Sequence, residues 1–347
     1  MALFRSSDIG LDLGTSSTLA YVRGKGIVLR EATAIAVERG TGKLIAIGAP
    51  AKEMLGREPE GLLVVQPLKE GVIANFDAAE RMLSRFFTQV VGSRVLFKPR
   101  VAIAVPSGAT EVEIRAVIEV SEGAGARYTY LVFEPMAAAI GAGLDIFAPE
   151  GRLALDIGAG TSDLVVICLG KAVASNSVRV GGDSFDRAIV RYFKRQHGIA
   201  IGTRAAEELK IRFGSACPRK EELPMQVVGR SLGGGMPLSL SLGSNELTYA
   251  LAEPLSAIVD QIKDLLEQTP PELCGDLTRN GICLSGGSAQ LYGFDKYISE
   301  QTGVLSFIAE DPAACVAVGA GKVLEDLRRY EGVLYDYRRG DYYEEKN

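Results

Sequence analysis

Hydrophobic positions recur with two different periods along the first half of the chain. Short apolar runs at 9–13, 19–22 and 27–29 are separated by glycines, which predicts antiparallel strands joined by turns. From 78 to 91 the apolar residues recur every three or four positions, which predicts a helix with one buried face. An apolar strand then leads into a helical pattern over 101–144, and it does so twice.

The second half repeats this order. Apolar runs at 153–157 and 163–170 predict two strands followed by a turn, and two glycines then open a predicted helix over 181–198. Residues 201–247 are richer in charge, glycine and proline, so we interpret them as a smaller helix-and-strand insertion. The pattern then predicts a helix at 246–269, a strand at 281–287 and a last helix at 313–327. A polar, Tyr-rich tail follows at 328–347, and we expect it to be loosely attached.

This alternation of strands and helices predicts an α/β protein with mixed sheets. At 347 residues the chain is longer than one hydrophobic core usually supports, so two domains are expected. Each half opens with nearly the same stretch, IGLDLGTSST from Ile9 and LALDIGAGTSD that begins at residue 153, which indicates a duplicated architecture.

Composition narrows the class of protein. Apolar residues make up 47% and charged residues 23%, which is ordinary for a folded globular chain. Lys and Arg number 38 against 43 Asp and Glu, so no overall basic field favours nucleic acid as a partner. The five scattered cysteines, without a C-x-x-C pair, indicate reduced thiols in a cytoplasmic protein. We find neither a signal-peptide pattern nor an apolar run of membrane-spanning length, which predicts a soluble protein.

The repeated stretch carries the candidate chemistry. In each copy a buried strand ends in an aspartate, Asp12 or Asp156, and then turns through Gly, Thr and Ser. Such turns offer backbone N–H groups and hydroxyls to phosphate oxygens, and two of them can clamp one phosphate chain. The aspartates repel phosphate but can hold Mg²⁺ or its water ligands beside it. A single copy would equally suit a β-turn whose Asp accepts from turn amides, so the argument depends on the repetition.

Two further features fit a nucleotide site. A third glycine turn, Gly286 and Gly287 in LSGGSAQL, follows an apolar strand and would let a nucleoside approach the backbone closely. Glu134 stands where a strand ends and Pro135 starts a helix, so it can orient water or, alternatively, only complement the helix dipole. The chain has neither the G-x-x-x-x-G-K-[ST] motif of P-loop proteins nor a G-x-G-x-x-G at its first helix.

These motifs resemble the actin, Hsp70 and sugar-kinase superfamily of ATPases, in which two duplicated α/β domains close over Mg-ATP. The resemblance to the MreB family of bacterial actin homologues covers about residues 7–326 and is carried by SDIGLDLGTSSTLAYVRGKGIVL, PLKEGVIANFDAAERML, VPSGATEVEIRAV and EDPAACVAVGAGKVLE. It implies an actin-like ATPase fold around a nucleotide cleft, with ATP, or GTP as an alternative, and Mg²⁺ as cofactors. It also implies slow hydrolysis coupled to polymerisation.

The resemblance also assigns residues. Glu134, Asp156 and Thr161 would be catalytic, and Asp12 and Asp156 would hold Mg²⁺ through water. The nucleotide would bind at Asp12, Gly14, Thr15, Ser16, Gly158, Ala159, Gly160, Thr161, Gly182, Glu207, Lys210, Gly286, Gly287 and Ser288. The chain departs from the family pattern at three places, with Ala159 and Ser288 in place of glycine and Thr-Ser-Asp at 161–163 in place of Thr-Thr-Glu. Glu207 and Lys210 lie one helical turn apart, so a surface ion pair is their alternative role.

The same resemblance divides the chain into subdomain IA at 1–32, 67–144 and 313–347, IB at 33–66, IIA at 145–182 and 246–312, and IIB at 183–245. It implies paired, head-to-tail filaments at the inner face of the cytoplasmic membrane, with cell-wall elongation proteins as partners and rod shape as the outcome. The alternatives are a sugar or acid kinase, an Hsp70-type chaperone and a protein that binds nucleotide without hydrolysing it. The pattern predicts neither the extra substrate domain of a kinase nor the substrate-binding region of a chaperone.

Leu96 and Phe97 are the candidate membrane contact. They stand between Arg94 and Lys98, with Arg100 nearby, after a predicted helix and before a buried strand. Two apolar side chains in such a loop can enter lipid tails while the cations meet anionic headgroups. The family that the chain resembles carries a membrane-insertion loop at the same place. The alternative is that the pair belongs to the core.

Overall fold

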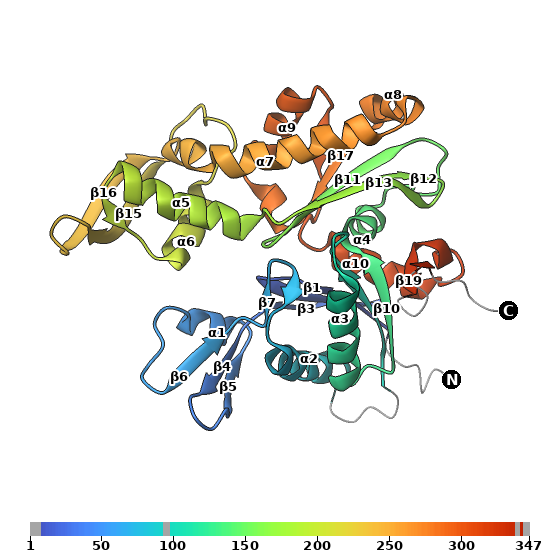
Figure 1. Ribbon diagram of the computed structural model, residues 1–347, viewed down its shortest axis with the longest axis horizontal. Helices are drawn as coiled ribbons and strands as arrows, with labels where there is room; N and C mark the ends of the chain where they lie inside the picture. Colours follow the sequence, from blue (N-terminus) through green and yellow to red (C-terminus); the bar gives the residue numbers. More distant parts are fainter. Residues whose placement is uncertain (1–7, 93–97, 337–340, 343–347) are drawn as a thin grey trace.

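The computed structural model describes residues 8–92, 98–336 and 341–342. They form two α/β halves, with the first half in the lower part of Figure 1 and the second half above it. Each half has one large sheet and one small sheet, and a two-stranded hairpin, β7 (Leu68–Lys69) with β8 (Val72–Ile73), lies in the first half. The predicted α/β class with mixed sheets is therefore confirmed.

The large sheet of the first half has the strand order β20-β19-β10-β9-β1-β2-β3. Its strands are β1 (Ile9–Leu13), β2 (Ser17–Val22), β3 (Gly26–Ala32), β9 (Arg100–Val105), β10 (Tyr128–Phe133), β19 (Leu334–Asp336) and β20 (Asp341–Tyr342). The accompanying helices are α2 (Phe76–Val91), α3 (Glu111–Gly123), α4 (Glu134–Gly141), α10 (Cys315–Glu325) and the 3₁₀ helix η2 (Glu331–Val333). α3 begins at Glu111 because Thr110 and Glu113 form a reciprocal capping box.

The large sheet of the second half has the order β13-β12-β11-β17-β18. Its strands are β11 (Arg152–Ile157), β12 (Ser162–Cys168), β13 (Lys171–Val178), β17 (Ile282–Ser285) and β18 (Ser306–Ile308). The accompanying helices are α5 (Gly182–Gln196), α7 (Glu246–Gln268), α8 (Pro271–Asn280), α9 (Phe294–Thr302) and the 3₁₀ helix η1 (Gly287–Gln290).

Each half carries a smaller appendage. In the first half the sheet β5-β4-β6 is built from β4 (Ile35–Glu38), β5 (Leu44–Ile47) and β6 (Leu62–Val65), with α1 (Ala49–Met54). In the second half the sheet β14-β15-β16 is built from β14 (Ile199–Ala200), β15 (Pro224–Ser231) and β16 (Pro237–Gly243), with α6 (Thr203–Phe213). The second of these agrees with the predicted helix-and-strand insertion over 201–247.

The two large sheets share one strand plan, which confirms the duplication predicted from the repeated stretch. β1 pairs antiparallel with β2 and parallel with β9, and β11 pairs antiparallel with β12 and parallel with β17. Helices α4 and α10 cross between the halves at very short range. A Cβ atom on Gly141 or Gly319 would lie 1.8 Å from a carbonyl oxygen of the other helix, so only glycine permits this crossing.

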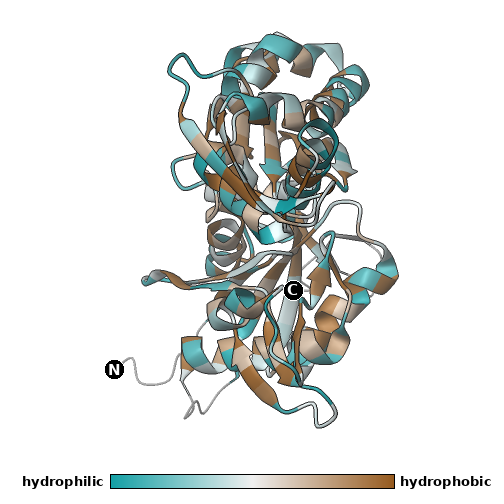
Figure 2. Cartoon of the chain, turned by 90° about the vertical axis from the view of Figure 1, so that its left-hand side faces the viewer, coloured by the Kyte–Doolittle hydropathy of each residue, from teal (hydrophilic) through white to brown (hydrophobic). Residues whose placement is uncertain are grey.

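The core follows the halves. Figure 2 shows apolar strands in the interior of both halves and polar residues on the outward sides of helices. Fully buried side chains include Phe86 on α2 in the first half and Phe185, Phe193 and Phe294 in the second. The helical period at 78–91 is confirmed, because its predicted apolar face is the face of α2 that packs on the sheet.

Two expectations from the sequence are wrong. The predicted loose tail begins with a segment that is part of the fold: Val333 and Leu334 are buried, and β19 pairs with β10 in the large sheet. The sequence around them is mostly polar, so its pattern did not indicate that these two apolar side chains are buried at the edge of a sheet. The sequence pattern also predicted no strand between the turn near 170 and the helix that follows, whereas β13 lies there; its mixed polar sequence suits an edge strand.

Candidate functional site

Each half supplies the same two-residue hairpin turn at the carboxyl end of its first strand. The N–H of Gly14 donates to the carbonyl of Ser17 at 3.1 Å, and the N–H of Gly158 donates to the carbonyl of Thr161 at 2.9 Å. The strands that lead into these turns are β1 and β11, which end just after Asp12 and Asp156. The sequence repeat is therefore also a repeat of local structure.

The two turns meet where the halves join. The N–H of Gly71, in the turn between β7 and β8, donates to Thr15 Oγ1 at 2.9 Å. A Cβ atom on Gly160 would lie 2.6 Å from Thr15 Oγ1 and 2.8 Å from Gly71 N. Because real Cβ atoms do not approach so closely, glycine at 160 is what lets the second turn reach the first.

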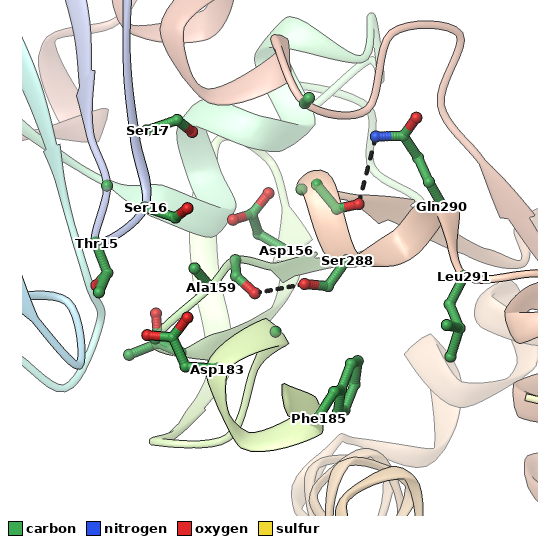
Figure 3. A pocket seen from close by; sticks show the side chains of 18 of the residues that line it. Thr15, Ser16, Ser17, Asp156, Ala159, Asp183, Phe185, Ser288, Gln290 and Leu291 are labelled. Carbon is green, nitrogen blue, oxygen red and sulfur yellow. Dashed lines mark hydrogen bonds between the residues drawn. The ribbon is translucent and has the colours of Figure 1, made fainter. Parts of the chain in front are cut away.

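A cavity of about 620 Å³ opens between these turns. Figure 3 shows Asp156 near its centre, with Thr15 and Ser16 on one side and Ser288 on the other. The cavity brings together every residue that the sequence assigns to the nucleotide or to catalysis: Asp12, Gly14, Thr15, Ser16, Glu134, Asp156, Gly158, Ala159, Gly160, Thr161, Gly182, Glu207, Lys210, Gly286, Gly287 and Ser288.

The second turn is buttressed by the start of α5 and by η1. The N–H groups of Gly182 and Asp183 donate to the carbonyls of Gly158 and Ala159 at 3.0 and 2.9 Å. Ser288 Oγ donates to the same Gly158 carbonyl at 2.8 Å, as Figure 3 shows. The hydroxyl of Ser288, which replaces a glycine of the family pattern, thus has a structural partner in this chain.

Four carboxyl groups gather near the turns: Glu134, Asp156 and Asp163 are buried, and Asp12 is half-buried. Burial and the neighbouring Asp156 charge raise the pKa of Asp12 to about 8. Burial also raises the pKa of Asp156 to about 7, although a 2.7 Å hydrogen bond from Ser285 Oγ opposes the shift. Glu134, at the start of α4, is 9% exposed, and burial together with the charges of Asp163, Asp156 and Asp12 raises its pKa well above the usual range.

Asp163 is the fourth of these groups and was not assigned to the site from the sequence. It is fully buried on β12, directly opposite Asp156, and its Oδ1 accepts from Ser107 N of the first half at 2.8 Å. Burial raises its pKa to about 6, against hydrogen bonds from Ser107, Ser177 and Thr161. Its Oδ2 has no hydrogen-bond partner among the described residues.

This donor set fits a hydrated magnesium ion bound together with phosphate. Among the described residues, neither Asp12, Glu134 nor Asp156 forms an ion pair with a lysine, arginine or histidine. Within the described ranges, no three His, Cys, Asp or Glu side chains form a ready-made metal site. Mg²⁺ suits such a place because it commonly uses one or two carboxylates, several waters and substrate phosphates.

Glu207 and Lys210 on α6 do not pair with each other as the alternative from the sequence suggested. Glu207 Oε1 accepts from Lys52 Nζ at 2.7 Å, and Lys52, on α1 of the other half, also donates to Ser16 Oγ at 3.2 Å. Lys210 Nζ lies 2.9 Å from Asp186 Oδ1 and donates to the Gly182 carbonyl at 2.9 Å. The two residues therefore connect α6 to different walls of the cavity.

Sequence reasoning missed twelve residues of the lining. Ser17 directly follows the first turn, Gly71 lies in the β7–β8 turn, and the others come from helices α5, α6, η1 and α10 and from the loops beside them. They are Ser17, Gly71, Asp183, Phe185, Ile211, Gly214, Arg219, Gln290, Leu291, Tyr292, Ala313 and Val316. Among these, Gly71 had a sequence signal, because the KEG turn stands between two short apolar stretches.

The candidate membrane pair, Leu96 and Phe97, lies outside the described residues. Arg100, one of the cations expected to accompany this pair, already has a partner within the protein: its guanidinium forms two hydrogen bonds with the carboxylate of Asp8. The expectation that Arg100 meets headgroups is therefore not supported. No helix in the described part of the chain has the length and apolar character that crossing a bilayer requires.

Comparisons with known proteins agree on one family. A family model described as MreB/Mbl protein matches residues 6–332. The cell shape-determining protein MreB of Escherichia coli (strain K12) is 46% identical over 335 residues, which cover 95% of this chain and 96% of the relative. The cell shape-determining protein Mbl of Bacillus subtilis (strain 168) is 41% identical over 320 residues, which cover 92% and 96%.

Solved structures give the same result. MreB5 of Spiroplasma citri bound to AMPPNP has a TM-score of 0.88 and 38% identity, and the match covers 93% of this chain and 97% of that one. The MamK double helical filament has a TM-score of 0.79 at 20% identity, which shows a common fold. It covers 92% of this chain and 99% of that one.

Proposed function

This chain belongs to the MreB/Mbl family of actin-like proteins, and from that premise we propose that it is an ATP-dependent cytoskeletal protein that sets cell shape. It would polymerise head to tail into paired filaments at the inner face of the cytoplasmic membrane. There it would direct cell-wall synthesis together with elongation proteins and so maintain a rod. The curated relatives named above are cell shape-determining proteins, which supports this role.

One observation carries the proposal: two equivalent glycine turns, one from each half, face a single cavity beneath buried carboxyl groups. A site built from both halves changes shape when the halves move relative to each other. A nucleotide that contacts both turns would therefore couple its own state to the angle between the halves. Filament assembly would depend on that angle, because the surfaces of each subunit must fit those of its neighbours.

The turns and the carboxylates would divide the work of binding. The N–H groups of the turns, with the hydroxyls of Thr15, Ser16 and Thr161, would donate to phosphate oxygens. Asp12 and Asp156 would hold Mg²⁺ through its water ligands, and the ion would supply charge that neutralises the phosphates. The structure of MreB5 of Spiroplasma citri was solved with AMPPNP and with ADP, which supports ATP as the nucleotide; GTP stays an alternative.

Glu134 would act on water rather than on phosphate. It lies at the carboxyl end of β10 and lines the cavity close to Asp156 and Asp163. A carboxylate there would accept a proton from the attacking water and align it with the terminal phosphate, with Thr161 beside it. Turnover would be slow and coupled to polymerisation. A protein that binds nucleotide without hydrolysing it is the remaining alternative for this step.

The decisive experiment measures phosphate release and assembly together on the purified protein with Mg-ATP. We expect filaments by electron microscopy and slow phosphate release that rises with polymer mass. Filaments without any phosphate release would mean that the protein binds nucleotide without hydrolysing it. Transfer of the γ-phosphate to a sugar or a small acid, which family membership does not favour, would overturn the proposal.

Membrane contact would be made through Leu96 and Phe97. One pair would bind weakly, at about 0.8 kcal/mol per buried CH₂, but a filament presents many copies in one plane. We therefore expect polymers, and not monomers, to sediment with anionic liposomes. Leu96→Ser combined with Phe97→Ser should abolish this sedimentation and leave filaments intact. Retained lipid binding, or a variant that fails to fold, would assign the pair to the core.

A further inference from the structure

A groove of about 350 Å³ lies on the first half, between α2 and the start of β5. It shares no residue with the cavity described above. It is lined by Leu44, Glu80, Arg81, Ser84, Arg85 and Thr88. The last four recur at intervals of three or four residues or lie side by side, so they form one exposed face of α2. The opposite face of the helix is the apolar one that packs on the sheet.

Two arginines give the groove its charge. Arg81 Nη1 donates to the carbonyl of Gly42, in the β4–β5 turn, at 2.9 Å, which holds this guanidinium in place. Arg85 follows one helical turn later. None of the ion pairs in the described part of the chain involves either arginine. Because a guanidinium has five N–H donors, both side chains keep donors for a ligand.

The acid in the lining, Glu80, does not neutralise this charge. Its carboxylate lies against the end of α3, where a Cβ atom on Gly123 would be 2.8 Å from Glu80 Cδ and 2.9 and 3.1 Å from its two oxygens. Within the described ranges it forms no ion pair with an arginine or a lysine. The groove is therefore positive, although the whole chain has a net charge of −5.

Ser84 completes the set of donors. It lies between Arg81 and Arg85 on the same face of α2, and its hydroxyl is a further donor. The hydroxyl of Thr88 instead donates to the Ser84 carbonyl at 2.8 Å. Guanidinium and hydroxyl donors on one face match the several acceptor oxygens of a phosphate group, which arginine binds through two parallel hydrogen bonds. The groove is therefore suited to an anion of the phosphate type.

The position of the groove in the chain favours a lipid as the source of that phosphate. α2 ends at Val91, about one helical turn after Thr88, and the chain then continues into the segment with Leu96 and Phe97, the proposed membrane contact. A bilayer that those two side chains enter would bring its headgroups to the same end of α2. The inference therefore rests on the membrane contact proposed above.

We propose that this groove binds the phosphate group of an anionic phospholipid, with Arg81, Ser84 and Arg85 as its donors. The apolar pair enters the lipid tails, and the groove adds the preference for anionic headgroups. Because every subunit of a filament repeats the groove, weak binding at each one adds up along the polymer. The groove lies outside the nucleotide cavity, so its loss leaves filament assembly and phosphate release unchanged.

The test measures co-sedimentation of the assembled full chain with phosphatidylcholine vesicles that contain or lack phosphatidylglycerol. Arg85→Gln should weaken binding to the phosphatidylglycerol vesicles by about fivefold, because each arginine near an anionic surface contributes about that factor. Combined with Arg81→Gln, the loss should reach about 25-fold. Filaments seen by electron microscopy and the rate of phosphate release from Mg-ATP should stay at their wild-type values.

Two further variants distinguish a built site from diffuse charge. Arg115→Gln is the matched control, because Arg115 is exposed on the neighbouring helix α3 but does not line the groove. This variant should change vesicle binding little. Ser84→Ala removes a donor without changing the charge and should weaken binding by about threefold, the size of one modest hydrogen bond. Arg85→Gln carries the main test, since Arg81→Gln also removes the bond to Gly42.

Several outcomes would overturn the groove as a headgroup site. An Arg85→Gln variant that binds vesicles like the wild type, or an equal loss in Arg115→Gln, would show that the groove is not the site of binding. Wild-type filaments that bind both kinds of vesicle equally would leave only the apolar pair as the membrane contact.

Two other occupants would show themselves in the same variants. Inorganic phosphate that binds without vesicles, and that Arg85→Gln no longer binds, would mean that the site serves a free phosphate compound. Unchanged lipid binding with altered pairing of filaments would assign the groove to a contact between copies of the chain. Wild-type filaments that do not sediment with phosphatidylglycerol vesicles at all would instead overturn the proposed membrane contact itself.

Discussion

The two hairpin turns have the same backbone but different side chains. The first turn presents Thr15 and Ser16 between its strands, and the second presents Ala159 and Gly160 at the equivalent places. The first turn thus offers hydroxyls. The two central residues of the second turn carry no polar side chain, and α5 and η1 form hydrogen bonds with the carbonyls of Gly158 and Ala159. The two halves therefore share one backbone plan, but their hairpin turns make different contacts.

The carboxyl groups are distributed just as unevenly. Opposite Asp12 on the neighbouring strand stands Leu19, and opposite Asp156 stands Asp163. An acid also follows the last strand of the parallel series β1-β9-β10 and of the parallel series β11-β17-β18: Glu134, directly after β10, is buried at the cavity, and Asp311, a few residues after β18, lies on the surface 3.3 Å from Arg30. The comparison teaches that position in the repeated strand plan does not decide chemistry. The chemical environment of an acid depends instead on whether it is buried where the two halves join.

The largest expected effect is on the rate of phosphate release, and it should distinguish Glu134 from Asp311, the two acids that follow equivalent strands. Glu134→Gln should lower the rate of phosphate release from Mg-ATP by about a hundredfold or more, because it removes the group that accepts the proton from water. The nucleotide affinity should change little. Asp311→Asn, the matched surface acid, should release phosphate at the wild-type rate. An equal loss of affinity and rate in Glu134→Gln would mean that Glu134 holds the nucleotide instead.

The next effect concerns the acid at the end of each repeated strand. Asp156→Asn should weaken Mg-ATP binding by about tenfold to a hundredfold, since it removes a carboxylate that orients the ligands of the ion. Titrations with ATP in EDTA should show no such loss. Asp12→Asn gives the same comparison for the first half. A variant that loses affinity equally with and without Mg²⁺ would contradict a role at the ion.

The two glycines of the second turn differ in how close they lie to the first turn and to the β7–β8 turn. Gly160→Ala should lower the free energy of unfolding by about 1–3 kcal/mol, because the new methyl group would overlap Thr15 and the backbone of the β7–β8 turn. Gly158→Ala is the matched change, since its Cβ would meet only the Thr161 carbonyl, at 3.5 Å. Thermal or urea unfolding measures both. Similar losses in the two variants would show that the turns do not abut.

The smallest effect tests the carboxyl group that only the second half has. Burial raises the pKa of Asp163 from 3.8 to about 6, so the folded protein binds its proton more tightly than the unfolded chain does. This contribution to stability is present below about pH 4 and is lost as the pH rises toward 6. In nucleotide-free protein, Asp163→Asn should therefore show a smaller fall in Tm between pH 4 and pH 6. Equal slopes in variant and wild type would exclude Asp163 as the source.

A local pattern was enough to predict much of the site. A strand that ends in Asp and turns through glycine is a short-range feature, so both glycine turns could be predicted from about ten residues each. Glu134 was found in the same way, because Pro135 marks the start of its helix. The resemblance to the family then added the residues of α6 and η1, and the structure places all of them around one cavity.

Other features depend on residues that the chain brings together from far apart. Nothing around Lys52 or Arg219 forms a motif, yet Lys52 reaches Glu207 across the cavity and Arg219 stacks on Tyr292. The same holds for Val333 and Leu334, whose burial depends on an open edge at β10. Sequence alone thus determined the two α/β halves and the acids and turns that each strand carries, since these follow from local periodicity. Only the tertiary structure decided which acids are buried, which turn rests on the other and what closes the cavity, because burial and contact depend on how the two halves are packed together.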